Sequence, residues 1–192
     1  QKGNVCVHRL KAITALGGTE PRVDQHGPIT LSEKSGFALA SVAARAGGTK
    51  ATTMAIKRLT GAPVPGPGQT NGTKITAFWT GPDQWMLEAP YNSHEKLFEQ
   101  ATAEVKGKAS VTEQSDGWCR FDLQGEGLSA VMERLCAINM HNFEAGHATR
   151  TSIEHLGCFV ICRTKTHISI LGPRSSAGSL HHGLLIAIRS AY

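Results

Sequence analysis

The segment Phe78-Trp79-Thr80-Gly81-Pro82-Asp83-Gln84-Trp85-Met86-Leu87 constrains the fold more than any other part of the chain. Its centre, Gly81-Pro82-Asp83, is typical of a tight turn, because proline presets φ and the other two residues accept turn conformations. Apolar residues alternate with a period of two on both sides, at Ile75, Ala77 and Trp79 before the turn and at Trp85 and Leu87 after it. Alternation of this kind predicts two strands, each with one apolar face.

The rest of the chain divides around breaks rich in proline and glycine. We expect an irregular N-terminal arm over 1–27 and a single α+β domain over 28–192. Three prolines within 61–68 exclude a helix or a central strand there, so this segment is predicted to be a connector and an internal boundary. A short strand is predicted at 29–31 and a helix at 54–59. The alanine-rich segment 37–45 fits a helix or a buried strand, and a strand is favoured.

After the connector, an alternating strand, a turn containing glycine and an amphipathic helix recur three times. The first helix is predicted to begin at Asn92, with Glu95 reaching back to cap it. The second copy begins at a hairpin signal, Asp116-Gly117, and its helical stripe is Leu128, Val131, Met132, Leu135 and Cys136. The third has strands at 158–162 and 167–171, a turn at Gly172-Pro173, and the helical stripe Leu180, Leu184, Leu185 and Ile188. The pattern predicts an α+β fold with antiparallel sheets and helices packed on one face.

Composition restricts the setting and the partners. The net charge is +5, but the 20 Lys and Arg are dispersed, and the densest groups are only Lys57-Arg58 and Arg163-Thr164-Lys165. An ordinary solvated surface is therefore favoured over nucleic-acid binding. Five cysteines without a Cys-x-x-Cys pair indicate free, mostly buried thiols in a reducing compartment: Cys6, Cys119, Cys136, Cys158 and Cys162. We expect a soluble, cytoplasmic protein with no membrane partner.

No motif in the sequence forms a convincing catalytic, cofactor or metal site. His181 and His182 are adjacent, so on a helix they point about 100° apart, and Cys158 and Cys162 lie about 13 Å apart along a strand. Gly125-x-Gly127 is a fragment of a phosphate-binding turn, for which tight packing is the favoured interpretation. The remaining candidates have no partner in sequence, or an ordinary role in helix capping or core packing: Glu126, Glu144, Ser175, Ser176, Ser179, Trp79, Trp85 and Trp118. One or more of the tryptophans could still anchor a protein interface.

Three segments together resemble the gamma subunit of heterotetrameric sarcosine oxidase: Phe37–Arg45, the connector 61–68 and Trp79–Leu87. The resemblance runs from near Leu31 to the last helix. It implies a smaller relative of the folate-binding aminomethyltransferase fold, in a complex with alpha, beta and delta subunits. Such a complex is an oxidoreductase that acts on CH–NH donors with oxygen as acceptor. It converts sarcosine to glycine and gives hydrogen peroxide, with formaldehyde or 5,10-methylenetetrahydrofolate.

The same resemblance implies that FAD, FMN and NAD belong to partner subunits, that tetrahydrofolate is used by the complex, and that this chain has no catalytic or cofactor-binding residue of its own. Its expected role is structural, in assembly. Two other hypotheses stay open at this point. One is a free-standing folate-binding protein of the aminomethyltransferase type, and the other is a binding module, for RNA or another partner, that uses the net positive charge.

Overall fold

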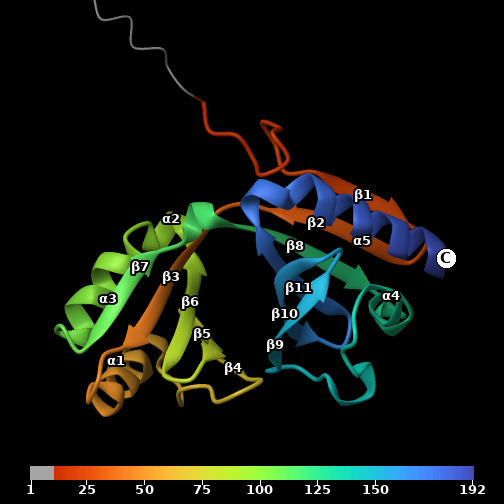
Figure 1. The fold of residues 1–192 in the computed structure, drawn as a ribbon. Coiled ribbons are helices and arrows are strands. Elements are labelled where there is room, and N and C mark those ends of the chain that lie inside the picture. The colour runs from red at the N-terminus through yellow and green to blue at the C-terminus, as the bar shows by residue number, and fades with distance from the viewer. Residues whose placement is uncertain (1–10) are drawn as a thin grey trace, which may run out of the picture.

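Two antiparallel sheets face one another, and each carries helices on its outer face (Figure 1). The computed structural model describes residues 11–192. The first sheet has the strand order β1-β2-β8-β11-β10-β9 and the second β4-β5-β6-β3-β7. The bounds of the strands are β1 Val23–His26, β2 Ile29–Lys34, β3 Phe37–Ala44, β4 Thr70–Gly72, β5 Thr76–Gly81, β6 Gln84–Pro90, β7 Ala109–Glu113, β8 Trp118–Gly125, β9 Ala148–Ile153, β10 Leu156–Thr164 and β11 His167–Pro173.

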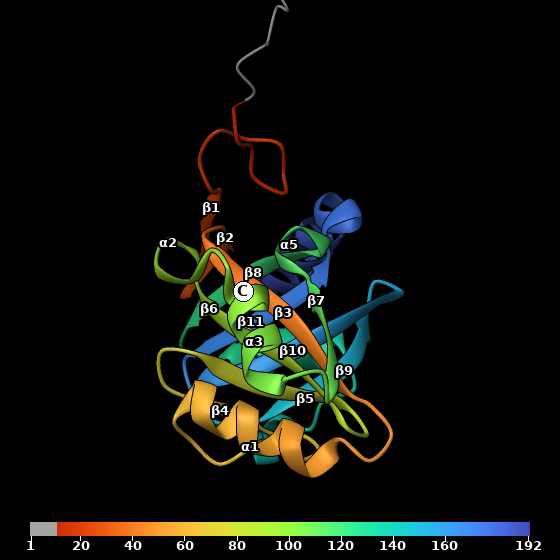
Figure 2. The ribbon, with the colours of Figure 1, turned by 90° about the vertical axis from the view of Figure 1, so that its left-hand side faces the viewer.

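Helices α1 and α3 pack on the second sheet, and α4 and α5 pack on the first. Their bounds, with those of the short helix α2 and three 3₁₀ turns, are α1 Thr49–Thr60, α2 Tyr91–His94, α3 Leu97–Val105, α4 Leu128–Leu135, α5 Ala177–Ala191, η1 Ser115–Gly117, η2 Met140–Asn142 and η3 Arg174–Ser176. In both views α1 lies at the end of the molecule opposite residues 11–22 (Figure 1 and Figure 2). None of the helices in the described part of the chain has the length and apolar character needed to cross a bilayer.

The predicted stripes form the two outer cores. The face of β6 that carries Trp85 and Leu87, with the same face of β5, packs under α1 and α3. The apolar stripes of α4 and α5 pack on β8, β10 and β11. A third and smaller core lies between the sheets, where Phe78 and Phe159 are 5.2 Å apart between ring centroids. The prediction of antiparallel sheets and helices is therefore confirmed in outline. Each sheet has helices on one face, as expected, and packs its opposite face against the other sheet.

The chain crosses between the sheets twice, from β2 to β3 and from β7 to β8. The predicted hairpin at Asp116-Gly117 is therefore wrong, since β7 and β8 belong to different sheets and η1 turns the chain from one to the other. The predicted helix start at Asn92 is also wrong. Asn92 lies inside α2, which begins after Pro90, and α3 follows as a separate helix.

The connector 61–68 contains neither helix nor strand, as predicted, but it is not a boundary. The strands before and after it, β3 and β4–β6, belong to one sheet. Pro65 is buried, and its carbonyl accepts a hydrogen bond of 2.9 Å from Trp85 Nε1. The connector is therefore held against the second sheet, which its composition alone does not reveal.

The expected irregular arm 1–27 is wrong at its end, because residues 23–26 form β1. This edge strand was missed because its polar residues show little apolar alternation; it forms by pairing with β2 across the turn at Gly27. Residues 11–22 contain no helix or strand, and Glu33 on β2 fixes them by accepting hydrogen bonds from the amides of Leu16 and Arg22. Cys6 and the first ten residues of the arm lie outside the described residues. The single domain over 28–192 stays a prediction.

Candidate functional site

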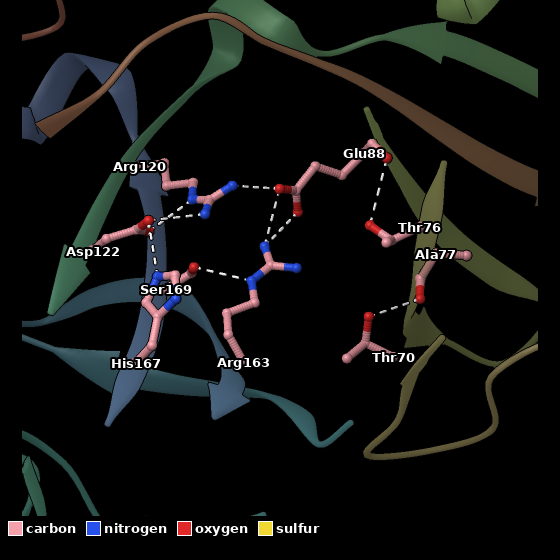
Figure 3. Close-up of polar contacts among 9 residues, drawn as sticks. All are labelled: Thr70, Thr76, Ala77, Glu88, Arg120, Asp122, Arg163, His167 and Ser169. Atoms are coloured by element: carbon pink, nitrogen blue, oxygen red, sulfur yellow. Dashed lines mark hydrogen bonds and ion pairs between the residues drawn. The ribbon is translucent and has the colours of Figure 1, made fainter. Parts of the chain in front are cut away.

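Charged side chains meet between the two sheets, although strands elsewhere bury mainly apolar groups. Glu88 comes from β6 of the second sheet, while Arg120 and Asp122 of β8, Arg163 of β10 and His167 of β11 come from the first (Figure 3). Alternation places them there, because the neighbours of Glu88 on β6 belong to the outer core and Glu88 itself points to the inner face. We call these five residues the inter-sheet ion cluster.

Glu88 links the two sheets. Its carboxylate accepts hydrogen bonds from Nη2 of Arg163, at 2.9 and 2.7 Å to its two oxygens, and from Nη1 of Arg120. The Glu88 side chain is 8% exposed, and those of Arg120 and Arg163 are 15% and 19% exposed. Charges buried to this extent need partners, because desolvation opposes their ionised forms. The two arginines and the two carboxylates of the cluster supply equal and opposite charge.

Asp122 is the most buried member of the cluster. Arg120 donates to it through Nε at 2.8 Å and Nη2 at 2.9 Å, and His167 Nε2 lies 3.0 Å from its second oxygen. Burial alone would raise the pKa of this carboxyl. The Arg120 guanidinium outweighs burial, with help from Ser169 and His167, and the pKa of Asp122 lies below its usual value. Asp122 is therefore ionised at neutral pH.

Serine, histidine and aspartate meet in this cluster, but not as a catalytic triad. In a triad the histidine lies between the carboxylate and the serine. Here His167 and Ser169 both act on Asp122, and the Ser169 hydroxyl accepts a hydrogen bond of 3.0 Å from Arg163 Nε. Ser169 is 0% exposed, so no substrate can reach its oxygen. The arrangement positions the sheets and does not activate a nucleophile.

A cleft of about 410 Å³ opens against the ion cluster, with Lys34 and Lys74 on its lining. Both carboxylates in this lining, Glu88 and Asp122, are already engaged by arginines. The lysines make no ion pair with any described residue. The cleft can therefore attract negative charge, but it offers no free carboxylate to a ligand.

A second and larger hollow, of about 610 Å³, lies where the two crossings meet residues 11–22. Its apolar lining includes Phe37, Phe98 and Trp118, and acidic residues of α2–α3 and of the β7–β8 crossing surround them. Trp118 is half-buried, and its ring packs 5.2 Å from that of Phe159. We call this hollow the apex groove. The tryptophans singled out in the sequence thus differ, since Trp85 belongs to a core and Trp118 lines an accessible surface.

The two histidines that suggested a metal diverge as expected. His181 is buried, with Nε2 2.8 Å from Asp24, while His182 is exposed. Within 11–192, no three side chains of the metal-binding types come together. Cys119, Cys136, Cys158 and Cys162 are free thiols. Burial raises the pKa of Cys119 and of Cys158 to about 11, so both favour the unreactive protonated form.

The glycine motif serves packing. At Gly125, φ is 141°, and a Cβ would lie 2.0 Å from the carbonyl oxygen of Pro28. At Gly127 a Cβ would lie within 2 Å of the Tyr192 hydroxyl, which donates a hydrogen bond of 3.0 Å to the Gly127 carbonyl.

The other candidate residues from the sequence lie outside the ion cluster. Ser176 occupies the predicted cap position of α5 without a side-chain capping bond, Ser175 lies in η3 and Ser179 in α5, and Glu126 and Glu144 lie outside the cluster.

The ion cluster itself was missed in the sequence. Its residues are scattered between 88 and 167, and only Arg163 was noted, as part of a basic group. The available signal was polarity at inward positions: Glu88, Asp122 and Ser169 each interrupt an apolar strand. A buried charge in a strand predicts a partner, but not which strand provides it.

Comparison with solved structures identifies the fold. Over 85% of this chain and 85% of the other, the structure is similar to a chain of the heterotetrameric sarcosine oxidase from Corynebacterium sp. U-96 in complex with pyrrole 2-carboxylate, with a TM-score of 0.75 and 21% identity. The chain shares the fold of that protein. It is also similar to the glycine cleavage system aminomethyltransferase T from Bartonella henselae, with a TM-score of 0.59 and 14% identity, over 82% of this chain and 48% of the transferase. No protein-family model and no curated protein sequence matches the chain.

Proposed function

We propose that this chain is the gamma subunit of a heterotetrameric sarcosine oxidase and that its role is assembly. The observation that carries the proposal is the shared fold over 85% of both chains. The chemistry of the ion cluster supports a structural role. Its donors and acceptors satisfy one another across the two sheets, and Ser169, which contacts Arg163 of the cluster, is inaccessible.

In this proposal the alpha and beta subunits supply the catalytic machinery, and the delta subunit is a further partner. The alpha and beta subunits carry FAD, FMN and NAD, and the complex oxidises sarcosine to glycine in the cytoplasm and passes the electrons to oxygen. The methyl carbon leaves as formaldehyde or as 5,10-methylenetetrahydrofolate. This subunit contributes shape and contact area.

The alternative is a free-standing folate-binding protein, which the likeness to the aminomethyltransferase favours. A pterin presents adjacent N–H donors that pair with a free carboxylate. The carboxylates of the inter-sheet cleft are both occupied by arginines, so that cleft does not fit a pterin.

Co-expression with the candidate partner subunits tests the proposal. We expect this chain to co-purify with the flavin-bearing chains, and the intact mass to equal the sum of four different subunits. Alone, it should aggregate at concentrations at which the assembly stays in solution, and it should show no flavin absorbance. If the chain stays monomeric when it is co-expressed with the partner subunits, the assembly role is refuted. Saturable binding of tetrahydrofolate by the isolated chain would favour the alternative.

A further inference from the structure

The apex groove combines an aromatic floor with an acidic rim. Phe37 begins β3 and Trp118 begins β8, each directly after a crossing between the sheets, and Phe98 comes from α3. Ile13, from the segment that borders the groove, is 58% exposed, and Tyr91 at the start of α2 is 41% exposed. Accessible aromatic and aliphatic side chains around a hollow of about 610 Å³ are characteristic of a surface that another protein covers.

The rim carries one more acidic than basic side chain, although the chain as a whole has a net charge of +5. Four carboxylates line the groove, Glu95, Glu99, Glu113 and Asp116, against three basic side chains, Lys34, Lys96 and Arg174. Of the carboxylates only Glu99 is paired, with Lys96 at 3.4 Å. Within 11–192, the other three form no ion pair.

The three carboxylates without an ion pair all influence the Tyr91 hydroxyl. The Tyr91 hydroxyl donates to Glu95 at 3.2 Å. That hydrogen bond raises the pKa of Tyr91, and the negative charges of Glu95, Asp116 and Glu113 raise it further. The three carboxylates therefore all lie close enough to Tyr91 to act on this one residue of the groove lining.

We propose that the apex groove receives a segment of a partner subunit in which an apolar side chain stands next to a lysine or arginine. The apolar side chain covers Trp118, and the basic group neutralises Glu113 and Asp116. This inference rests on the proposed assembly role and adds to it the surface and the kind of segment that it binds. Charge complementarity selects the partner, because a basic group gains from this rim and an acidic group is repelled.

The test is a competition during assembly. The wild-type chain and a Glu113→Lys/Asp116→Lys variant, with distinguishable tags, are co-expressed with the partner subunits, and the ratio in the purified assembly is measured by mass spectrometry. Both substituted residues are exposed, but Glu113 accepts a hydrogen bond of 2.7 Å from the amide of Ser115, so the variant is used once its melting temperature matches that of the wild type. A matched control, Glu126→Lys/Glu133→Lys, makes the same change in charge at exposed positions near α4.

We expect the groove variant to be at least tenfold under-represented relative to its soluble amount, and the control to be incorporated equally. The deficit should decrease in high salt, because ions screen exposed charges. A Trp118→Phe variant, which keeps the contact with Phe159, should be incorporated less than the wild type.

Equal incorporation of the groove variant would overturn the inference and leave the assembly role intact. Failure of the wild type to assemble would overturn both. A dimer of the isolated chain that the groove variant dissociates would assign the surface to a second copy and overturn the inference.

Discussion

Replacing Glu88 by glutamine tests whether the ion cluster holds the two sheets together. The substitution keeps the shape of the side chain and removes its charge. It leaves the Arg120 and Arg163 guanidiniums with one carboxylate between them, that of Asp122. Removing one partner of a buried ion pair costs about 3–5 kcal/mol, because the remaining charge stays desolvated. The arginines keep some contact with water, at 15% and 19% exposure, so we expect the lower value.

A loss of about 3 kcal/mol in the free energy of unfolding lowers the melting temperature of a chain of this size by about 6–12 °C. Tryptophan fluorescence of dilute protein, followed during heating and in urea, measures both quantities. The chain offers a matched control in Glu104, which pairs with Arg58 at 2.9 Å while both side chains are more than a third exposed. Glu104→Gln should cost about 0.5 kcal/mol or less.

A double-mutant cycle isolates the bond between the sheets. If Glu88 and Arg163 act on each other, Glu88→Gln combined with Arg163→Met should cost less than the sum of the two single changes, by about 1–3 kcal/mol. The Glu104–Arg58 pair should show a much smaller coupling. A cost below about 1 kcal/mol for Glu88→Gln, or additive effects in the cycle, would refute a cluster that fastens the sheets.

Three further outcomes follow from single groups. The folded-state pKa of Asp122 is lowered, so the contribution of its carboxylate to stability is complete above the unfolded pKa of about 3.9 and is lost as the pH falls through the folded value. The loss of stability caused by Asp122→Asn should therefore shrink below about pH 4. A constant difference between variant and wild type in urea unfolding across the acid range would contradict this. Gly125→Ala should destabilise far more than Gly36→Ala, because a Cβ at Gly125 meets backbone whereas one at Gly36 meets nothing within 4 Å, and similar melting temperatures would count against the close approach of β8 to Pro28. At pH 8, iodoacetamide should alkylate Cys119 and Cys158 at least tenfold more slowly than an unperturbed thiol, and rapid labelling of either, measured site by site by mass spectrometry, would show that burial does not protect it.

The outer cores could be predicted from the sequence because their signals are local. Period-two alternation fixed the faces of Trp85 and Leu87, and helical spacing fixed those of Leu128 and Leu184. Both periods depend only on neighbouring residues. The alanine-rich segment at β3 fits a helix or a buried strand by period, and the favoured strand is confirmed.

The pairing of strands could not be predicted, because it depends on residues far apart in the chain. The Asp116-Gly117 turn has hairpin chemistry, but β7 pairs with β3 and β8 pairs with β2 and β11. The same limitation hid the ion cluster, in which Glu88 meets an arginine 75 residues away. Alternation predicts that a side chain faces inward, and only the topology determines what it meets.

The weak apolar contact between the sheets gives the ion cluster its importance. The inter-sheet core is the smallest of the three, so directional bonds from Glu88 have a large share in setting the angle between the sheets. Phe37 and Trp118 of the apex groove lie directly after the two crossings that connect those sheets, and both pack at the margin of that same core. A change in the angle moves the crossings and with them the floor of the groove. Loss of the Glu88 carboxylate should therefore weaken docking at the apex groove as well as stability, although Glu88 itself does not line that surface.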